Sequence, residues 1–270
     1  ERLRARTEID ERAGRAAADI YRRAVNSRYL RDVSSGRVRP YFANARVVSD
    51  SPDKLRVPVR DGERRLADAI RREMDAATRE IIIVTPYFVP RRAGTDYYKS
   101  LAARGVRVRV ITNSLASTNH AYVHGGYAPY RMELLQAGVE LYEIRADAPQ
   151  VLGEVPADSD ITLTMHSKAV IFDRKRVFVG SLNFDPRSIE INTELGLFIA
   201  SRAMATELAE RIDKALGDYT YALSARGSDE IAFTYSGAGR TETHTTEPGV
   251  GLGPRLVVGV TMMLPVEGQL

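Results

Sequence analysis

The sequence has no cysteine and no long apolar run. The absence of cysteine excludes disulfides, thiolate catalysis and cysteine metal sites, but it leaves the cellular compartment open. No apolar stretch approaches the length of a membrane span, so we expect no transmembrane helix, and we see no signal-peptide pattern. The longest apolar runs, such as 81–84 and 177–179, are short, which is typical of buried strands.

Lysine is scarce as well, because only five of the 39 basic residues are lysine. Such a bias most often reflects the composition of a whole genome. The net charge of +4 and the isoelectric point near 9.3 suit an anionic partner, but they are too modest to identify one. In a chain that nearly always uses arginine, Lys168 is one of few lysines, which suggests that a compact point charge is needed at that position.

The 270 residues can form one large α/β domain with appendages. We expect a helical lead-in and connector at 1–57, a main domain at 58–222 and a C-terminal tail at 223–270. The chain opens in a charged helical pattern at 2–21 and does not begin with methionine, so we expect further sequence upstream. The tail is rich in Gly, Ser and Thr, and we expect it to be irregular, with a hairpin at most.

Between these appendages, short apolar segments alternate with helical patterns. The expected strands are 80–84, 106–111, 139–144, 168–172, 176–179 and 194–199, and the expected helices are 66–77, 96–104, 130–137 and 204–216. Helices between short apolar strands predict parallel βαβ units. The expected fold class is therefore α/β, a layered α/β/α domain with a mixed, largely parallel sheet, preceded by N-terminal helices.

The residues most suited to chemistry form the pattern H-x-K-x4-D-x6-G-S-x-N. Its members are His166, Lys168, Asp173, Gly180, Ser181 and Asn183. On a strand, His166 and Lys168 project from the same face. The next strand returns, so the hydroxyl of Ser181 and the amide of Asn183 reach the same edge. A nucleophile or acid beside several donors is what phosphoryl transfer requires. A lone histidine or a lone Gly-Ser turn is ordinarily structural, but the complete pattern favours a catalytic site.

This pattern resembles the HKD motif of the phospholipase D superfamily, and every specified position matches. The resemblance implies that His166, Lys168 and Asp173 are catalytic, although Asp173 is expected mainly to anchor Lys168 and the local turn. Lys168, Ser181 and Asn183 would hold phosphate oxygens. It also implies that Glu194 orients the catalytic histidine by accepting a hydrogen bond from its far ring nitrogen. The alternative for Glu194 is an ordinary exposed strand residue.

Segments 85–90, 112–116, 123–127 and 181–188 are similar to bacterial cardiolipin synthases, in particular to the cardiolipin synthase C branch. This resemblance implies a metal-independent phosphatidyl transfer without cofactor, at the surface of a bacterial membrane. Its substrates would be phosphatidylglycerol and a second phospholipid such as phosphatidylethanolamine. His124 and Tyr127 would line a head-group pocket.

Members of this family use two HKD motifs, and this chain contains one, which is similar to the C-terminal motif. The second motif would come from upstream sequence or from a homodimer partner. One histidine attacks phosphorus and the other acts as acid and base, and which role belongs to His166 stays open.

Two other functions are compatible with the sequence. A nuclease of the same superfamily would need a groove of arginine and aromatic side chains, and no such cluster is visible, so we expect no nucleic-acid partner. The other is an inactive half that binds only phosphate or a partner chain. His120 and His124 have the spacing of metal ligands on a helix, but the intervening Glu is missing and 125–126 is Gly-Gly, which should end a helix. We therefore expect no metal site.

Overall fold

The computed structural model describes residues 25–37 and 40–263. Contacts divide the chain into two units, Glu1–Phe42 and Ala43–Leu270. In the first unit, helix α2 (Arg28–Ser34) begins after Ser27, whose hydroxyl accepts a hydrogen bond from the Leu30 amide. The helical pattern expected at 2–21 lies outside the described residues.

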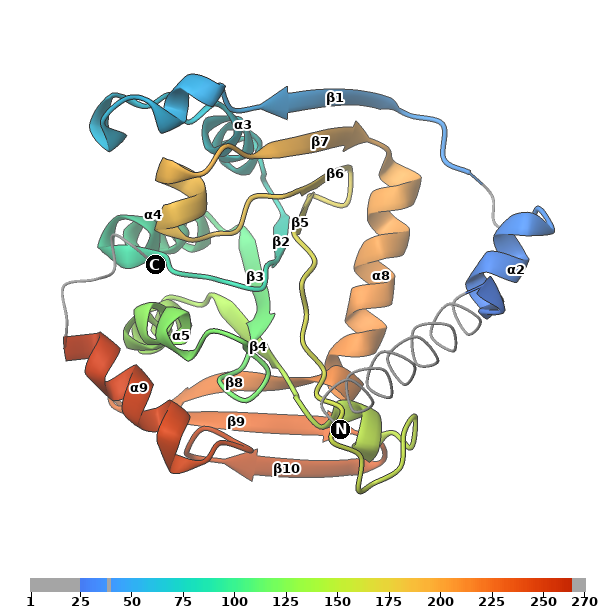
Figure 1. Ribbon diagram of the computed structural model, residues 1–270, viewed down its shortest axis with the longest axis vertical. Helices are drawn as coiled ribbons and strands as arrows, with labels where there is room; N and C mark the ends of the chain where they lie inside the picture. Colours follow the sequence, from blue (N-terminus) through green and yellow to red (C-terminus); the bar gives the residue numbers. More distant parts are fainter. Residues whose placement is uncertain (1–24, 38–39, 264–270) are drawn as a thin grey trace, which may run out of the picture. The chain divides into compact units, whose positions relative to one another are not determined.

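The second unit is built on a ten-stranded sheet in the order β1-β7-β6-β5-β2-β3-β4-β8-β9-β10 (Figure 1). Its strands are β1 (Asn44–Ser49), β2 (Glu80–Val84), β3 (Arg107–Asn113), β4 (Glu140–Ile144), β5 (Ala169–Phe172), β6 (Arg176–Gly180), β7 (Leu195–Ala200), β8 (Thr220–Arg226), β9 (Glu230–Gly237) and β10 (Arg240–His244). The lead-in, the motif-bearing segment and the C-terminal segment thus all contribute strands to one sheet.

The sheet is mixed, but the prediction that it is largely parallel is wrong. Only β2–β3 and β3–β4 pair in parallel, and these are the strands separated by helices. The other seven strand pairs are antiparallel. For three of these pairs the reason is the length of the connection: a parallel pair needs a long crossover, whereas the turns after β5, β8 and β9 are only two or three residues long.

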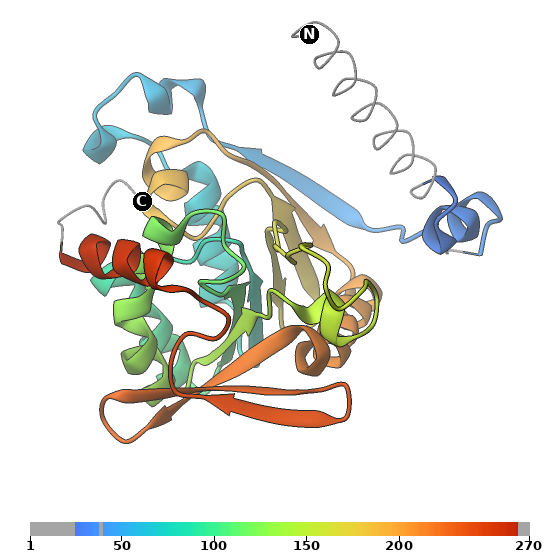
Figure 2. The same ribbon diagram turned by 60° about the horizontal axis from the view of Figure 1, so that its bottom comes forward.

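Helices cover both faces of this sheet, as the layered prediction required. The helices are α3 (Arg65–Asp75), α4 (Arg91–Ala103), α5 (Ala121–Tyr127), α6 (Arg131–Gln136), α7 (Ala148–Val151), α8 (Arg202–Tyr219) and α9 (Leu252–Met263), with short turns η1 (Pro52–Leu55), η2 (Val59–Asp61), η3 (Ala128–Tyr130) and η4 (Arg187–Ile191). On one face, α3, α4 and α6 pack on Ile81 and Ile83 of β2. On the other, α8 packs on Ile82 (Figures 1 and 2). Successive isoleucines of β2 therefore point to opposite faces of the sheet and pack against different helices.

The C-terminal segment is regular, which contradicts the expected irregular tail. Strands β8, β9 and β10 form a meander closed by turns at Gly227 and Gly239, both with positive φ (68° and 72°). Phe233 and Tyr235 are buried and join the core, while the threonines of β10 lie on a more exposed strand. The threonine-rich composition of this segment is therefore that of an exposed edge strand, not that of a loop. No helix within 25–37 and 40–263 is long and apolar enough to cross a membrane.

Candidate active site

One end of the β5–β6 hairpin carries four residues of the sequence pattern, His166, Lys168, Ser181 and Asn183. His166 and Lys168 directly precede β5, and the Gly180 amide at the end of β6 donates to the Lys168 carbonyl (3.2 Å). The Ser181 amide then donates to the carbonyl of Leu195, the first residue of β7 (2.9 Å). Asn183 follows two residues later. The predicted convergence of these four side chains at one edge follows from this pairing of three antiparallel strands.

His166 is exposed, and its ring makes no hydrogen bond with any residue that the structure describes. Lys168 is half-buried, and its Nζ donates to the His166 carbonyl (3.0 Å). Burial lowers the pKa of Lys168, and the charges of Glu194 and Asp185 partly oppose this shift. The edge thus carries an available imidazole and a lysine whose ammonium keeps further donor capacity for an anion.

Glu194 is bound to Ser181 instead of to the histidine. The Ser181 hydroxyl donates to Oε2 of Glu194, and Asn192 lies near its other oxygen (3.4 Å). Glu194 is buried with 7% exposure, so the alternative of an exposed strand residue is wrong. Among the described residues, Glu194 makes no hydrogen bond to His166, and its role as the histidine's orienting acid stays a prediction. The Ser181 hydroxyl hydrogen is used in the bond to Glu194. Ser181 can therefore donate to a bound phosphate only if it gives up its hydrogen bond to Glu194.

Asn183 is half-buried and only partly satisfied. Its Nδ2 donates to the Ser188 hydroxyl over a long 3.3 Å contact. Its Oδ1 is buried and has no hydrogen-bond partner among the described residues. Since an amide nitrogen carries two hydrogens, one donor of Asn183 stays available for an oxyanion.

A buried ion pair that the sequence analysis missed supports this edge. Lys54 donates to Asp50 (2.7 Å), and both side chains are 0% exposed. Asp50 also accepts from the Glu194 amide (3.3 Å), and Lys54 donates to the carbonyl of Ser188 (3.4 Å). The pair therefore fixes the backbone on both sides of the site. The scarcity of lysine was a usable signal here, because Lys54 is one of the five.

Asn113, at the end of β3, holds the residue before the histidine. Its Nδ2 donates to the Met165 carbonyl and its Oδ1 accepts from the Met165 amide, both at 2.9 Å. Ser117 also donates to Oδ1 (3.1 Å), and Asn113 is 2% exposed. This side chain pairs with Met165 as a neighbouring strand would, and so it fixes the position from which His166 projects. Sequence reasoning included Asn113 only as part of a resembling segment.

Asp173 lies at the opposite end of β5 and does not anchor Lys168, which corrects that part of the prediction. Its carboxylate accepts hydrogen bonds from the amides of Thr78, Arg79 and Glu80 at 2.8–3.2 Å, and from the Thr78 hydroxyl. Burial raises the pKa of Asp173, but these bonds outweigh burial and the pKa is lowered. Asp173 also adopts φ 53° in the turn after β5. The expected role in the local turn therefore holds.

His124 and Tyr127 lie on α5 and are buried, with 5% and 2% exposure. Their polar atoms face a charged cluster inside the protein, and their role in a head-group pocket stays a prediction. Helix α5 continues through Gly125 and Gly126, contrary to the expectation that they end it. A Cβ on Gly125 would lie 2.8 Å from Thr261, so the glycine allows α9 to pack closely on α5.

The comparisons with known proteins agree with this geometry. The family model described as "Cardiolipin synthase, PLD-like domain" matches residues 70–216. The chain belongs to this phospholipase D-like family.

Among relatives of this phospholipase D-like domain, cardiolipin synthase C of Escherichia coli is 33% identical over 258 residues, which cover 90% of the chain and 54% of that protein. Cardiolipin synthase 2 of Staphylococcus epidermidis is 27% identical over 68% of the chain and 32% of its own length. The chain thus spans about half of the first relative and about a third of the second. The crystal structure of phosphatidylserine synthase from Haemophilus influenzae shares the fold (TM-score 0.51, 13% identity), covering 82% of the chain and 45% of that structure.

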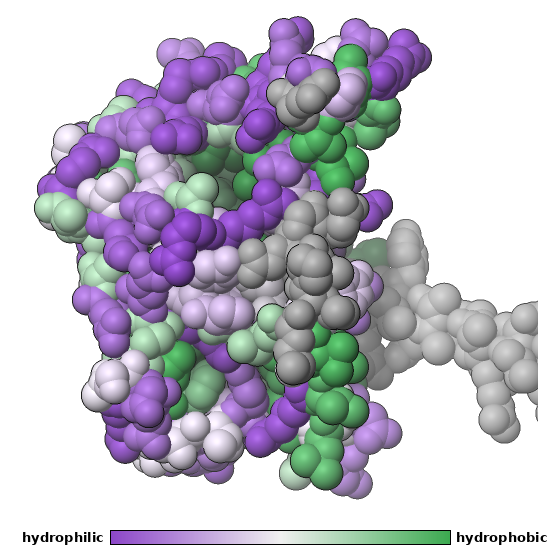
Figure 3. All heavy atoms as spheres, turned by 90° about the vertical axis from the view of Figure 1, so that its left-hand side faces the viewer, coloured by the Kyte–Doolittle hydropathy of each residue, from purple (hydrophilic) through white to green (hydrophobic). Residues whose placement is uncertain are grey.

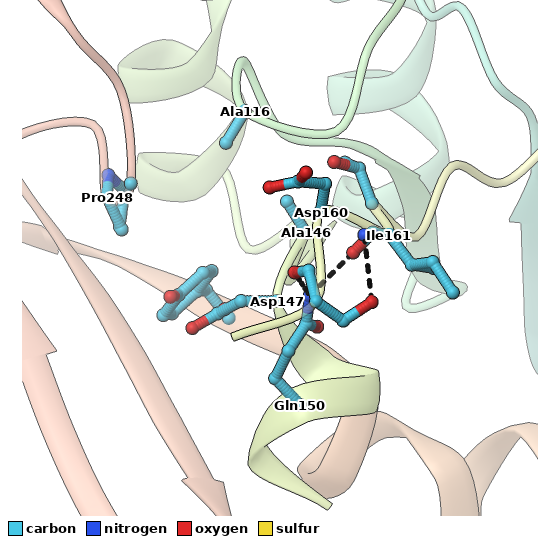
Figure 4. A pocket seen from close by; sticks show the side chains of 11 residues that line it. Ala116, Ala146, Asp147, Gln150, Asp160, Ile161 and Pro248 are labelled. Carbon is cyan, nitrogen blue, oxygen red and sulfur yellow. Dashed lines mark hydrogen bonds between the residues drawn. The ribbon is translucent and has the colours of Figure 1, made fainter. Parts of the chain in front are cut away.

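A polar cavity of about 380 Å³ lies beside the loop that leads to His166 in this phospholipase D-like domain. Asp147, Asp160 and Gln150 line it, and Gln150 donates to the carbonyls of Ser159 (2.8 Å) and Ile161 (2.6 Å) (Figure 4). None of the pattern residues lines this cavity. His166, Lys168, Ser181 and Asn183 therefore lie outside this cavity, and His166 is exposed.

Proposed function

We propose that the chain is the catalytic half of a phosphatidyltransferase that makes cardiolipin from phosphatidylglycerol and a second phospholipid such as phosphatidylethanolamine. The observation that carries the proposal is the convergence of His166, Lys168 and Asn183 on one edge with unused bonding capacity. A phosphodiester needs a nucleophile or acid on one side and donors for its oxygens on the other. Membership of the cardiolipin synthase-like family supports the choice of a lipid phosphodiester.

The proposed reaction has two displacements at phosphorus. A histidine nitrogen forms a bond to phosphorus while the bond to the head-group alcohol breaks, and that alcohol leaves with a proton. A hydroxyl of phosphatidylglycerol then attacks the phosphohistidine, loses its proton and releases the histidine. Lys168 and Asn183 hold the phosphate oxygens in both steps, so the residues require no metal for charge stabilisation. Water competes with the acceptor, and phosphatidic acid is the expected side product.

The proposal requires a second histidine, which acts as acid and base if His166 attacks, or attacks if His166 serves as the acid and base. We infer that it comes from the remaining half of the full-length protein or from a second copy of this chain. Two features support this arrangement. The site lies on an open edge, and the chain spans about half of cardiolipin synthase C.

The proposal also places the protein at a membrane surface as a peripheral protein. Helix α9 supports this location, because it presents a row of exposed apolar side chains (Figure 3). Leu252, Leu256 and Val260 succeed one another at intervals of four, with exposures of 87%, 69% and 48%. Side chains at this spacing share one helix face, and such a face is stabilised by contact with lipid.

The test uses the full-length protein with vesicles of phosphatidylglycerol and phosphatidylethanolamine in EDTA, and lipid products are read by mass spectrometry. We expect cardiolipin from the wild type and a loss of about 10⁴-fold or more in His166→Ala. The matched control is His244→Ala, which removes a half-exposed histidine from β10 and should leave the rate unchanged.

Absence of lipid turnover by the folded wild type would overturn the proposal. If the same preparation cleaves a nucleic-acid phosphodiester through His166, the assignment moves to a nuclease. If it cleaves neither and still binds phosphate, the chain is an inactive half.

A further inference from the structure

A second polar cluster lies buried between α5, β4 and the segment that precedes α9. His124, Glu143 and Glu247 each direct one potential ligand atom into it, and these atoms lie within 4.8 Å of one another. Within 25–37 and 40–263, no other group of three histidine or acidic side chains meets this geometry. His124 is 5% exposed and Glu143 is 0% exposed, and the side chain of Glu247 is 16% exposed. The cluster is thus removed from bulk water.

Arg131 binds only one oxygen of each carboxylate. Its Nη1 contacts Oε1 of Glu143 (3.1 Å), and its Nη2 contacts Oε1 of Glu247 (2.5 Å). The atoms that remain are buried and have no hydrogen-bond partner among the described residues: Oε2 of Glu143, Oε2 of Glu247, Nε2 of His124 and the hydroxyl of Tyr127. His124 Nε2 lies 3.6 Å from the nearest oxygen of Glu247, too far for a good hydrogen bond. Buried polar atoms without partners are uncommon and call for an explanation, of which a bound ion is one.

The charges of this cluster favour a cation as the bound ion. The carboxylates of Glu143 and Glu247 face one guanidinium, that of Arg131. An imidazole nitrogen with two carboxylate oxygens is a common ligand set for Zn²⁺ and for Mn²⁺.

We propose that His124, Glu143 and Glu247 bind one divalent transition-metal ion, with Zn²⁺ or Mn²⁺ as the fitting class. Arg131 orients both carboxylates through their other oxygens, as residues around metal ligands ordinarily do. The ion joins α5 and β4 to the chain between β10 and α9, so its role is structural. It does not enter the chemistry at His166, and the proposal stands or falls independently of the proposed reaction.

The sequence analysis considered His124 only together with His120. The structure separates this pair: His120 packs between Tyr87 and Tyr122 (ring centroids 5.7 and 5.3 Å apart). The acidic partners of His124 come instead from β4 and from the segment after β10, which are 19 and 123 residues away along the chain.

The experiment uses the full-length protein without a histidine tag, stripped with chelator and then titrated with Zn²⁺, Mn²⁺ or Co²⁺. Bound metal is counted by mass spectrometry after gel filtration, the Co²⁺ visible spectrum reports coordination, and thermal unfolding is followed with and without metal. Glu247→Gln keeps the size of the side chain and removes its charge. His120→Gln is the matched control, since it changes a histidine on the same segment outside the cluster.

We expect the wild type and His120→Gln to bind one more ion per chain than Glu247→Gln, and to melt at a higher temperature with metal than after EDTA. In Glu247→Gln the affinity should fall at least about 10–100-fold and the Co²⁺ bands should disappear. The proposal is overturned if Glu247→Gln and the wild type retain the same amount of metal. It is also overturned if added metal leaves the melting temperature of the stripped wild type unchanged and produces no Co²⁺ bands, since the cluster would then hold no ion.

Discussion

The two ends of strand β5 carry different parts of one sequence pattern, and their chemistry differs. At the start of β5, the ring of His166 has no hydrogen-bond partner among the described residues, and Asn183 has an unsatisfied oxygen. At the far end, Asp173 accepts hydrogen bonds from three successive amides and a hydroxyl. There too, Glu80 is bound by Arg109 (2.9 Å) and Arg174 (2.9 Å).

This difference indicates that the pattern residues at the two ends of β5 have different roles. Lys168 and Asp173 are five residues apart, which is roughly 16 Å along an extended strand. They cannot act on the same phosphate. Because Lys168 precedes β5 and Asp173 follows it, the spacing between them in the pattern corresponds to the length of this strand. The open end suits binding and chemistry, whereas the satisfied end holds β5 against β2. Substitutions at the first end should therefore change activity, and substitutions at the second should change stability.

The largest effect that sharpens this comparison is expected for Lys168→Met in the full-length protein. Methionine keeps much of the side-chain length and removes the charge that would stabilise the phosphate oxygens. We expect the rate of phosphatidyl transfer to fall about 10²–10³-fold, and the free energy of unfolding to change by less than about 0.5 kcal/mol. Lipid turnover and urea denaturation measure the two quantities.

The matched control for this substitution is Lys214→Met, on the exposed surface of α8. It should change neither activity nor stability. If Lys168→Met lowered stability as much as activity, the open end would be structural too, and the contrast between the ends of β5 would fail.

A smaller loss of activity is expected for Asn113→Ala, which removes both hydrogen bonds to Met165. His166 would then be less well positioned, and a displacement of about 1 Å can cost on the order of 10²-fold. We expect the loss in kcat, with KM little changed, because the phosphate donors remain. Steady-state kinetics on vesicles measure both constants.

Asn44→Ala, on exposed strand β1, is the control for Asn113→Ala. A purely structural role of Asn113 predicts a lower melting temperature with an unchanged kcat for the folded fraction, and that result would remove Asn113 from the positioning of His166.

How much of this organisation the sequence reveals depends on the distance over which each contact forms. The shared edge of His166, Lys168, Ser181 and Asn183 was predictable, because a short hairpin fixes their positions through local spacing alone. The parallel strands β2, β3 and β4 were predictable for a similar reason, since α4 connects the first pair and a short segment with α5 and α6 connects the second.

The contacts that support the site were not predictable in this way. Lys54 reaches Ser188 across 134 residues, and Asn113 reaches Met165 across 52. No periodicity in the sequence encodes which distant strand end will lie beside which. The composition of β10 was misleading as well, because threonines on an edge strand resemble those of a loop. The role of Asp173 was half predicted, since the turn was visible in the sequence and its partners at Thr78–Glu80 were not.

The last prediction concerns the satisfied end and its dependence on pH. Asp173→Asn keeps a residue type that tolerates positive φ, but it removes the charge that accepts the amides of residues 78–80. We expect the free energy of unfolding at pH 7 to fall by about 1–3 kcal/mol, with kcat of the folded protein unchanged. The pKa of Asp173 is lowered below its ordinary value of 3.8, so its contribution is fully present above 3.8 and is lost as the pH falls through the lowered value. Urea denaturation from pH 7 to pH 3 should therefore show a constant difference in the free energy of unfolding between wild type and variant down to about pH 5, and this difference should narrow below pH 3.8.

Asp229→Asn, on the exposed turn before β9, is the control and should show no such difference. A gap between wild type and Asp173→Asn that stayed constant through the acid range would mean that the neutral side chain serves the turn as well as the carboxylate does. The charge at this end of β5 would then have no part in holding it to β2.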